Sequence, residues 1–219
     1  MKYFPLEKLA AAVSTRSRQK KYAQFLSCIR PTKDTTILDV GVNTTEYSPA
    51  DNFLEKHYPY PKNITVVATG NLQVWNALYP EIRSVEADGR ALPFEDDHFD
   101  VAYSNAVIEH IGDNAEQVRF LRELWRVSRS GFLTTPNRLF PIEVHTRVPL
   151  LHLLLPKKYF DSFLKRIGKG WAADDYIHLL SEKELRSLFS QAGITGYTLI
   201  QNRFLGFPMT FTIVWKKYQ

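Results

Sequence analysis

Short β-rich runs alternate with helical segments through the middle of this chain, and this alternation limits its fold more than any other feature. The runs are short, rich in β-branched and apolar residues and bounded by turn-forming residues, as strands are. They cover residues 35–40, 64–68, 82–85, 99–103 and 132–135. Strands that alternate with helices favour right-handed crossovers and a parallel sheet, which binds ligands at the carboxyl ends of its strands. Functional residues are therefore expected just after each strand.

Helical patterns fill the segments between and before these runs. In the first 33 residues, apolar side chains repeat at helical spacing on either side of a polar interval at residues 14–17, which predicts two N-terminal helices. Ser48, followed by Pro49, offers an N-cap for a helix after the first strand. Residues 72–79 and 118–125 carry further helical patterns.

The C-terminal part predicts one helix followed by a pair of strands. Ser181 and Glu184 form a capping box, and Gly193 is well placed to end that helix. Residues 209–215 alternate as a strand and can pair with residues 194–200. At 219 residues, 44% of them apolar, the chain is expected to form a single domain. Its expected parts are N-terminal helices, a core, a cap and the C-terminal helix with its strand pair, at residues 1–33, 34–135, 136–180 and 181–219.

No segment has the pattern of a membrane span or a signal peptide. The longest apolar stretch, residues 148–156, is interrupted by His152 and falls short of the roughly 20 residues that a membrane-spanning helix needs. The N-terminus lacks the apolar core of a signal peptide, so we expect a cytoplasmic protein. Cys28 is the only cysteine, which excludes an internal disulfide and a multi-cysteine metal site.

The formal net charge of +5 is unevenly distributed. Lysine and arginine outnumber acids strongly in residues 1–33 and again in residues 141–170. Such clusters can bind membrane lipid, nucleic acid or a phosphorylated substrate, but solvated helix faces produce the same counts and are the simpler interpretation. Peripheral membrane contact through these basic segments, and a location at a membrane surface, therefore stay open.

Polar residues follow four of the predicted strands: Asp39 with Gly41, the Thr69-Gly70-Asn71 turn, Ala87-Asp88-Gly89 and Ser104-Asn105. Their spacing resembles that of the class I S-adenosylmethionine-dependent methyltransferases. The resemblance covers residues 35–189. It depends on three motifs: Leu38-Asp39-Val40-Gly41, the run from Asp88 to Phe94 with Phe99-Asp100, and Ser104-Asn105-Ala106-Val107-Ile108-Glu109-His110. Within the class, the chain resembles the type 11 methyltransferases, and residues 135–158 resemble a bacterial subgroup of small methyltransferases.

The resemblance implies a Rossmann-like α/β fold, with a doubly wound, mostly parallel seven-stranded sheet, an antiparallel C-terminal strand and helices on both faces. It also implies S-adenosyl-L-methionine as cofactor. Asp39 would help to hold the ammonium group of its methionine part, and Asp88 would accept a hydrogen bond from its adenine amino group. The cofactor-binding residues implied in this way are Asp39, Gly41, Val42, Asn43, Thr69, Asn71, Asp88, Gly89, Arg90, Asn105 and Ala106.

The sequence departs from the family pattern in two places. The second and third glycines expected after Gly41 are replaced by Asn43 and Thr45. Asparagine is tolerated at positive φ and can keep the turn, whereas β-branched Thr45 indicates a reshaped loop. The acid expected after the second strand is replaced by Thr69-Gly70-Asn71, where Asn71 could supply neutral hydrogen bonds to the ribose.

Methyl transfer is an in-line displacement, so most of its catalysis can come from holding the nucleophile near the methyl carbon. A general base is needed only where the nucleophile must lose a proton. Glu109 and His110 follow the fourth strand, and Glu143 and His145 follow the fifth. His110 is the first candidate base and His145 the second, with Glu109 as a further catalytic candidate; a structural role for His110 is the alternative. We expect no metal site.

The leading hypothesis is an enzyme that methylates a small molecule. Leucines and prolines in residues 150–156 precede basic residues and could form a lid for an amphipathic or lipid-like acceptor, or a cap packed on its own domain. The alternative is a methyltransferase-like binding or scaffold protein with weak or no turnover, which the altered loop after Gly41 suggests.

Two further classes fit the residues less well. A nicotinamide-dependent oxidoreductase would need the two glycines that are missing after Gly41. Methylation of nucleic acid is not expected, because residues 104–107 lack an Asn-Pro-Pro-aromatic or Asp-Pro-Pro-aromatic motif for a flipped base. The residues give no indication of an oligomeric state.

Overall fold

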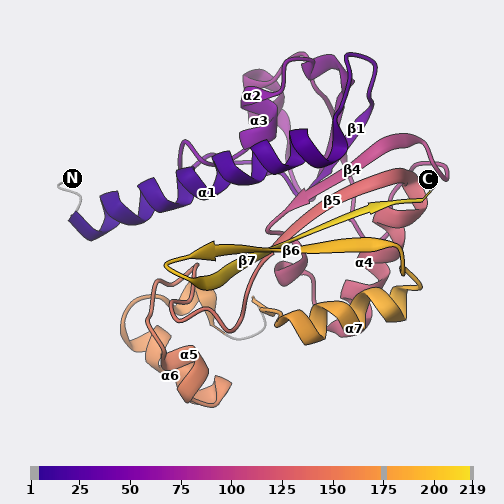
Figure 1. Cartoon of the computed structure of the whole chain (residues 1–219). Helices are drawn as coiled ribbons and strands as arrows, with labels where there is room; N and C mark the ends of the chain where they lie inside the picture. Colours follow the sequence, from indigo (N-terminus) through magenta and orange to yellow (C-terminus); the bar gives the residue numbers. More distant parts are fainter. Residues whose placement is uncertain (1–4, 174–176, 218–219) are drawn as a thin grey trace.

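The computed structural model describes residues 5–173 and 177–217, with side chains from residue 11 onward. A seven-stranded sheet crosses the molecule in the order β3-β2-β1-β4-β5-β7-β6 (Figure 1). Strands β1 to β5 pair in parallel, and β7 runs antiparallel to both of its neighbours. The strands are β1 Ile37–Val40, β2 Ile64–Ala68, β3 Arg83–Glu86, β4 Phe99–Asn105, β5 Ser128–Pro136, β6 Tyr197–Phe204 and β7 Phe207–Lys216. The predicted fold class is confirmed.

Helices cover both faces of this sheet (Figure 1). One face packs against α1, α2 and α3, and the other against α4 and α7. The α-helices are α1 Pro5–Ile29, α2 Phe53–His57, α3 Gln73–Leu78, α4 Asn114–Val127, α5 Leu151–Leu154, α6 Lys157–Arg166 and α7 Glu182–Ala192. Short 3-10 turns are η1 Pro61–Asn63, η2 Ile108–His110 and η3 Gly170–Ala172. None of the described helices is long and apolar enough to cross a membrane.

The central strands are buried on both faces, which explains their nearly continuous apolar sequences. All four residues of β1 and all five of β2 are buried, whereas β3 at the sheet edge is half-buried to exposed. Asp39 is the one charged residue in β1, and it lies one residue before the end of the strand. A buried charge in this position needs a functional or structural partner.

The N-terminal segment forms one helix, so the prediction of two helices is wrong. Helix α1 runs without a break through residues 14–17. That interval contains serine, threonine and arginine but no glycine or proline, and such residues cost at most about 0.7 kcal/mol each in a helix. Near its C-terminal end, Phe25 packs edge-on against Tyr103 and Phe132 and holds α1 across the sheet.

The helix predicted from Ser48 is also wrong in its start. Residues 48–52 form turns, because the Asp51 carboxylate accepts hydrogen bonds from the backbone N–H groups of Tyr47 (2.8 Å) and Ser48 (2.9 Å). Helix α2 begins only at Phe53, after Asn52 in the left-handed conformation at φ 47°. The predictions for the C-terminal part are confirmed, including the capping box of Ser181 and the end of α7 at Gly193.

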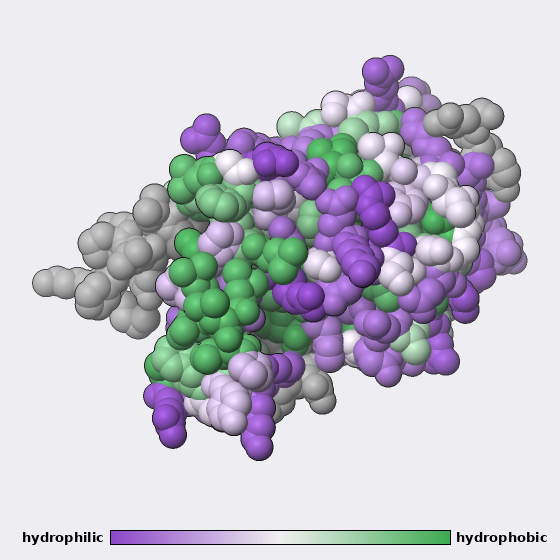
Figure 2. Space-filling model, turned by 60° about the horizontal axis from the view of Figure 1, so that its bottom comes forward, coloured by the Kyte–Doolittle hydropathy of each residue, from purple (hydrophilic) through white to green (hydrophobic). Residues whose placement is uncertain are grey.

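Residues 137–173 lie beside the sheet as a cap, with α5 and α6 at the lower left of Figure 1. The cap has a small apolar cluster of its own, formed by Val148, Phe160, Leu164 and Ala172. Its outer side exposes further apolar residues, among them Leu154 with 71% of its surface exposed. Figure 2 shows apolar side chains gathered over α5, α6 and the turn between β6 and β7.

Candidate active site

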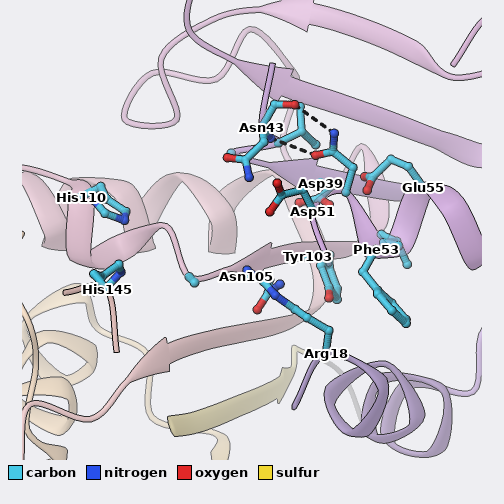
Figure 3. A pocket seen from close by; sticks show the side chains of 15 residues that line it. Arg18, Asp39, Asn43, Asp51, Phe53, Glu55, Tyr103, Asn105, His110 and His145 are labelled. Carbon is cyan, nitrogen blue, oxygen red and sulfur yellow. Dashed lines mark hydrogen bonds between the residues drawn. The ribbon is translucent and has the colours of Figure 1, made fainter. Parts of the chain in front are cut away.

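A cavity of about 220 Å³ opens where β1 and β4 end. Its walls come from the loop after β1, from α1 and α2, from the end of β4, and from two histidines (Figure 3). Among the predicted site residues, those that line the cavity are Asp39, Gly41, Val42, Asn43, Asn105, Ala106, His110 and His145. The strands thus bring together residues that the sequence separates by up to about a hundred positions, as a parallel sheet does at its carboxyl edge.

The loop after β1 is fixed by one glycine and one asparagine clamp. Gly41 has φ 100°, and a Cβ there would lie 2.4 Å from a methyl carbon of Val107, so this position requires glycine. The Asn52 side chain accepts a hydrogen bond from the Asn43 N–H and donates one to the Asn43 carbonyl, both at 2.9 Å (Figure 3). Asn43 itself is not at positive φ, so the prediction that it keeps the turn in that way is wrong. The clamp from Asn52 holds the loop instead.

Two buried carboxyl groups form one wall of the cavity. Asp39 and Glu55 are each only 6% exposed. Burial raises the pKa of Asp39, and the nearby Glu55 carboxylate raises it further; burial also raises the pKa of Glu55. The pair therefore favours holding a shared proton when no cation is bound. Glu55 Oε1 has no hydrogen-bond partner among the described residues, so this wall is ready to accept a donor.

Arg18 of α1 contributes a positive charge to the same cavity. It forms no salt bridge with any residue that the structure describes. The cavity thus presents an acid pair and a guanidinium group, which together suit the ammonium and carboxylate groups of an amino acid.

A buried lysine lies next to this region. Lys21 is 5% exposed, and its Nζ lies 3.5 Å from the Asn105 amide oxygen. Burial lowers its pKa to about 7, and the Arg18 charge contributes to this shift while Glu109 opposes it. Thr134 also donates to the Asn105 amide oxygen, at 2.6 Å, so the Asn105 side chain is held through its oxygen.

His110 and His145 meet at the far end of the cavity (Figure 3). Their rings lie 5.3 Å apart and nearly perpendicular. The His145 Nδ1 lies 2.8 Å from Glu143, and its Nε2 lies 3.9 Å from the fully buried Glu109. Burial opposes a charge on His145, but the hydrogen bond and charge of Glu143, followed by the charge of Glu109, outweigh it and raise the His145 pKa. The pKa of Glu143 falls to about 2, because its hydrogen bonds with His145 and Thr146 outweigh burial.

The residues predicted to bind ribose and adenine do not line this cavity. Thr69 and Asn71 are exposed, and the Asn71 side chain accepts a hydrogen bond from the Gln73 N–H at the start of α3. The Asp88 carboxylate is bound by Arg90 through both of its oxygens, which lowers the Asp88 pKa. Arg90 in turn reaches Glu116 of α4 at 2.5 Å.

Gly89, also among the predicted adenine-binding residues, is fixed by close packing. A Cβ there would lie 2.7 Å from Phe120 and 2.9 Å from Val40. These contacts account for glycine at this position by themselves.

Several residues of the site carried no recognisable signal in the sequence. Arg18 and Lys21 lie in the first helix, and their side chains reach the site because α1 crosses the sheet. Glu55 lies in the short helix α2 and Asn52 immediately before it, and the start of this helix was predicted in the wrong place. The buried acid near a strand end, Asp39, was the only visible hint that a partner such as Glu55 must lie nearby.

Comparisons with known proteins find a family model that matches the core of the chain and solved structures that share its fold. Residues 38–133 match the model of a methyltransferase domain family. An S-adenosylmethionine-dependent methyltransferase from Methanosarcina mazei is similar in structure, with 15% identity, a TM-score of 0.59, and coverage of 84% of this chain and 92% of that one. One from Thermotoga maritima has 15% identity, a TM-score of 0.58, and coverage of 98% and 96%. A search of the curated proteins found no match.

Proposed function

We propose that this chain transfers the methyl group of S-adenosylmethionine to a small-molecule acceptor in the cavity after β1 and β4, because residues 38–133 match the model of a methyltransferase domain family. The observation that carries the proposal is that two buried acids share the walls of that cavity with Arg18, which forms no salt bridge with any described residue. This is the charge pattern that the methionine part of the cofactor requires.

The residues present fit the cofactor. S-adenosylmethionine supplies a methyl group activated by a positive sulfonium. Asp39 and Glu55 would hold its ammonium group, for which Glu55 Oε1 is an unpartnered buried acceptor. Arg18 would bind its carboxylate, and the missing side chain at Gly41 lets the loop close tightly at the cavity wall. Val42, Asn43 and Ala106 would add backbone and packing contacts.

We further propose that the adenosine end extends beyond the cavity toward Asp88, Gly89 and Arg90, with Thr69 and Asn71 near the ribose. Arg90 occupies both oxygens of Asp88. An adenine amino group could use Asp88 only after Arg90 turns away or shares one of these oxygens. Cofactor binding therefore involves a local rearrangement at this end.

Asn105 and the two histidines would act on the acceptor. Asn105 and His110 line the cavity and can orient a polar acceptor beside the methyl group. His110 would serve as general base where the acceptor must lose a proton. The raised pKa of His145 favours its protonated form. A histidine that already carries its proton cannot accept another, so His145 is the second candidate for the general base.

The cap supports an amphipathic acceptor and contact with a membrane surface. Leu153, Leu154 and Leu155 are exposed on α5 and just after it. Lys157 and Lys158 follow at once, so apolar and basic side chains lie together as they do in interfacial helices. Figure 2 shows the apolar part of this surface.

Calorimetric titration with S-adenosylhomocysteine tests the binding site. We expect binding to the wild type and a loss of affinity of about 10- to 100-fold in Arg18→Met and Asp39→Asn, the range for a lost charge-assisted hydrogen bond. Arg16→Met, an exposed arginine on the same helix, is the matched control and should bind normally. Equal affinities in all four proteins would contradict the proposed placement of the cofactor.

A further inference from the structure

Three potential metal ligands meet at the end of the cavity. Glu109, His110 and His145 each offer one ligand atom, and these atoms all lie within 4.8 Å of one another. Both histidines line the cavity, and the carboxylate lies behind them. We infer that this cluster is a binding site for a divalent transition-metal ion, with zinc as the best match. This inference departs from the expectation of no metal site, which local patterns could not correct because the ligands come from two distant segments.

Glu109 provides the strongest evidence for a cation. Its side chain is fully buried, and its Oε2 accepts a hydrogen bond from Thr135 at 3.0 Å. Its Oε1, the oxygen nearest to His145, has no hydrogen-bond partner among the described residues. A buried carboxylate oxygen without a partner is costly, and buried polar groups are almost always satisfied. A metal ion at this point would satisfy it.

His145 is oriented as metal-binding histidines usually are. Its Nδ1 is paired with the Glu143 carboxylate at 2.8 Å, which leaves Nε2 directed toward Glu109 at 3.9 Å. Glu143 is itself fixed by hydrogen bonds from the backbone N–H groups of His145 (3.0 Å) and Thr146 (2.5 Å). A carboxylate behind a ligating histidine fixes its tautomer and ring and raises its basicity toward the metal.

The type of metal follows from the donors. Two imidazoles and one carboxylate hold catalytic zinc, and the same set holds iron(II) in some oxygenases. In a tetrahedral zinc site the ligand atoms lie about 3.3 Å apart. The His145 Nε2–Glu109 Oε1 pair at 3.9 Å must therefore close by about 0.6 Å, and no pair by more than about 1.5 Å. Small shifts of the two histidine side chains toward Glu109 would provide this movement, and a shift of this size lets His145 keep its contact with Glu143.

An open coordination position would face the cavity, because both histidines line it. That position suits a hydroxyl oxygen of the acceptor, whose pKa the ion would lower so that the proton leaves to solvent. This part of the inference depends on the proposed function, gives the ion rather than His110 the task of activating the acceptor, and narrows the acceptor to an oxygen-bearing compound. The metal site itself does not depend on it.

Titration of the metal-free protein with Zn²⁺ alone tests the site without any activity assay. We expect one equivalent to bind, to raise the melting temperature, and to lose at least tenfold in affinity in His145→Ala and in Glu109→Gln, which keeps the shape of the buried side chain. His98→Ala, an exposed histidine before β4, is the matched control and should bind as the wild type does. Absence of binding, or equal binding in wild type and His145→Ala, would overturn the inference.

Two further measurements separate the parts of the argument. Titration with S-adenosylhomocysteine in the presence of EDTA reports on the proposed function, and titration with Zn²⁺ reports on the metal site. The open position is tested with Co²⁺-loaded protein, whose visible spectrum should change when acetohydroxamate is added. An unchanged spectrum would refute the open position facing the cavity.

Discussion

Replacement of Lys21 by methionine should stabilise the protein, and by an amount that depends on pH. Lys21 is almost fully buried, and burial lowers its pKa from 10.5 to about 7. Between these two values the unfolded chain binds a proton at this position and the folded chain does not. Stability therefore rises as pH increases through this window, and below pH 7 the folded state carries the full cost of a buried ammonium group.

The size of the effect follows from the shift. A change from 10.5 to about 7 corresponds to about 5 kcal/mol between the two protonation states, since each unit is worth 1.36 kcal/mol. At pH 7 nearly all of this cost remains, so Lys21→Met should raise the free energy of unfolding by about 4 kcal/mol, reduced by any loss of the contact with Asn105. The advantage should shrink by about 1.4 kcal/mol for each pH unit up to about pH 10.

Urea unfolding at pH 7, 8 and 9 measures this difference directly. The wild type and Lys21→Met are compared in the presence of EDTA, which keeps the proposed metal site empty beside Glu109. Lys20→Met removes an exposed lysine one position earlier and should show no pH-dependent difference from the wild type. A difference between Lys21→Met and the wild type that stays constant from pH 7 to 9 would refute the buried, deprotonated lysine.

Three other predictions concern the cofactor and the cap. Affinity for S-adenosylmethionine should rise with pH through the raised pKa of the acid pair, because a bound cation displaces its proton; calorimetry at pH 5.5 and 8 should show a smaller pH effect in Asp39→Asn. Asp88→Ala should weaken binding of S-adenosylhomocysteine more than Asn43→Gly, since the latter keeps the backbone clamp; the reverse order would contradict it. Leu154→Glu should lower sedimentation with phosphatidylglycerol vesicles about tenfold, whereas Val74→Glu, on exposed α3, should not.

The sheet was predictable because local sequence and tertiary position agree there. The strand from Ile64 to Ala68 is almost entirely apolar and is buried throughout, so its sequence alone indicates a buried strand. The predicted break at residues 14–17 failed because polarity alone does not end a helix without glycine, proline or a cap. The predicted helix start at Ser48 was wrong because the Asp51 carboxylate accepts hydrogen bonds from the N–H groups of Tyr47 and Ser48 and closes a turn there.

The site was predictable only where it follows the sheet. Asp39 lies near the end of β1 and His110 in the turn after the neighbouring β4, and the parallel register brings them to one cavity. Arg18 reaches the same cavity only because Phe25, two turns further along α1, anchors the helix between Tyr103 and Phe132. No local pattern contains that information, since it depends on where a helix crosses the sheet.

The altered loop after β1 is the main reason to consider a protein without turnover, and its structure weakens that reason. Glycines are needed where φ is positive or where a Cβ would clash, and in residues 41–51 only Gly41 meets either condition. Asn52 holds the loop in place, because its side-chain amide makes hydrogen bonds with both the N–H and the carbonyl group of Asn43. Cofactor affinity is then set less by the glycine pattern than by the charges around the cavity, where Asp39, Glu55 and Arg18 remain in place for an amino-acid ligand.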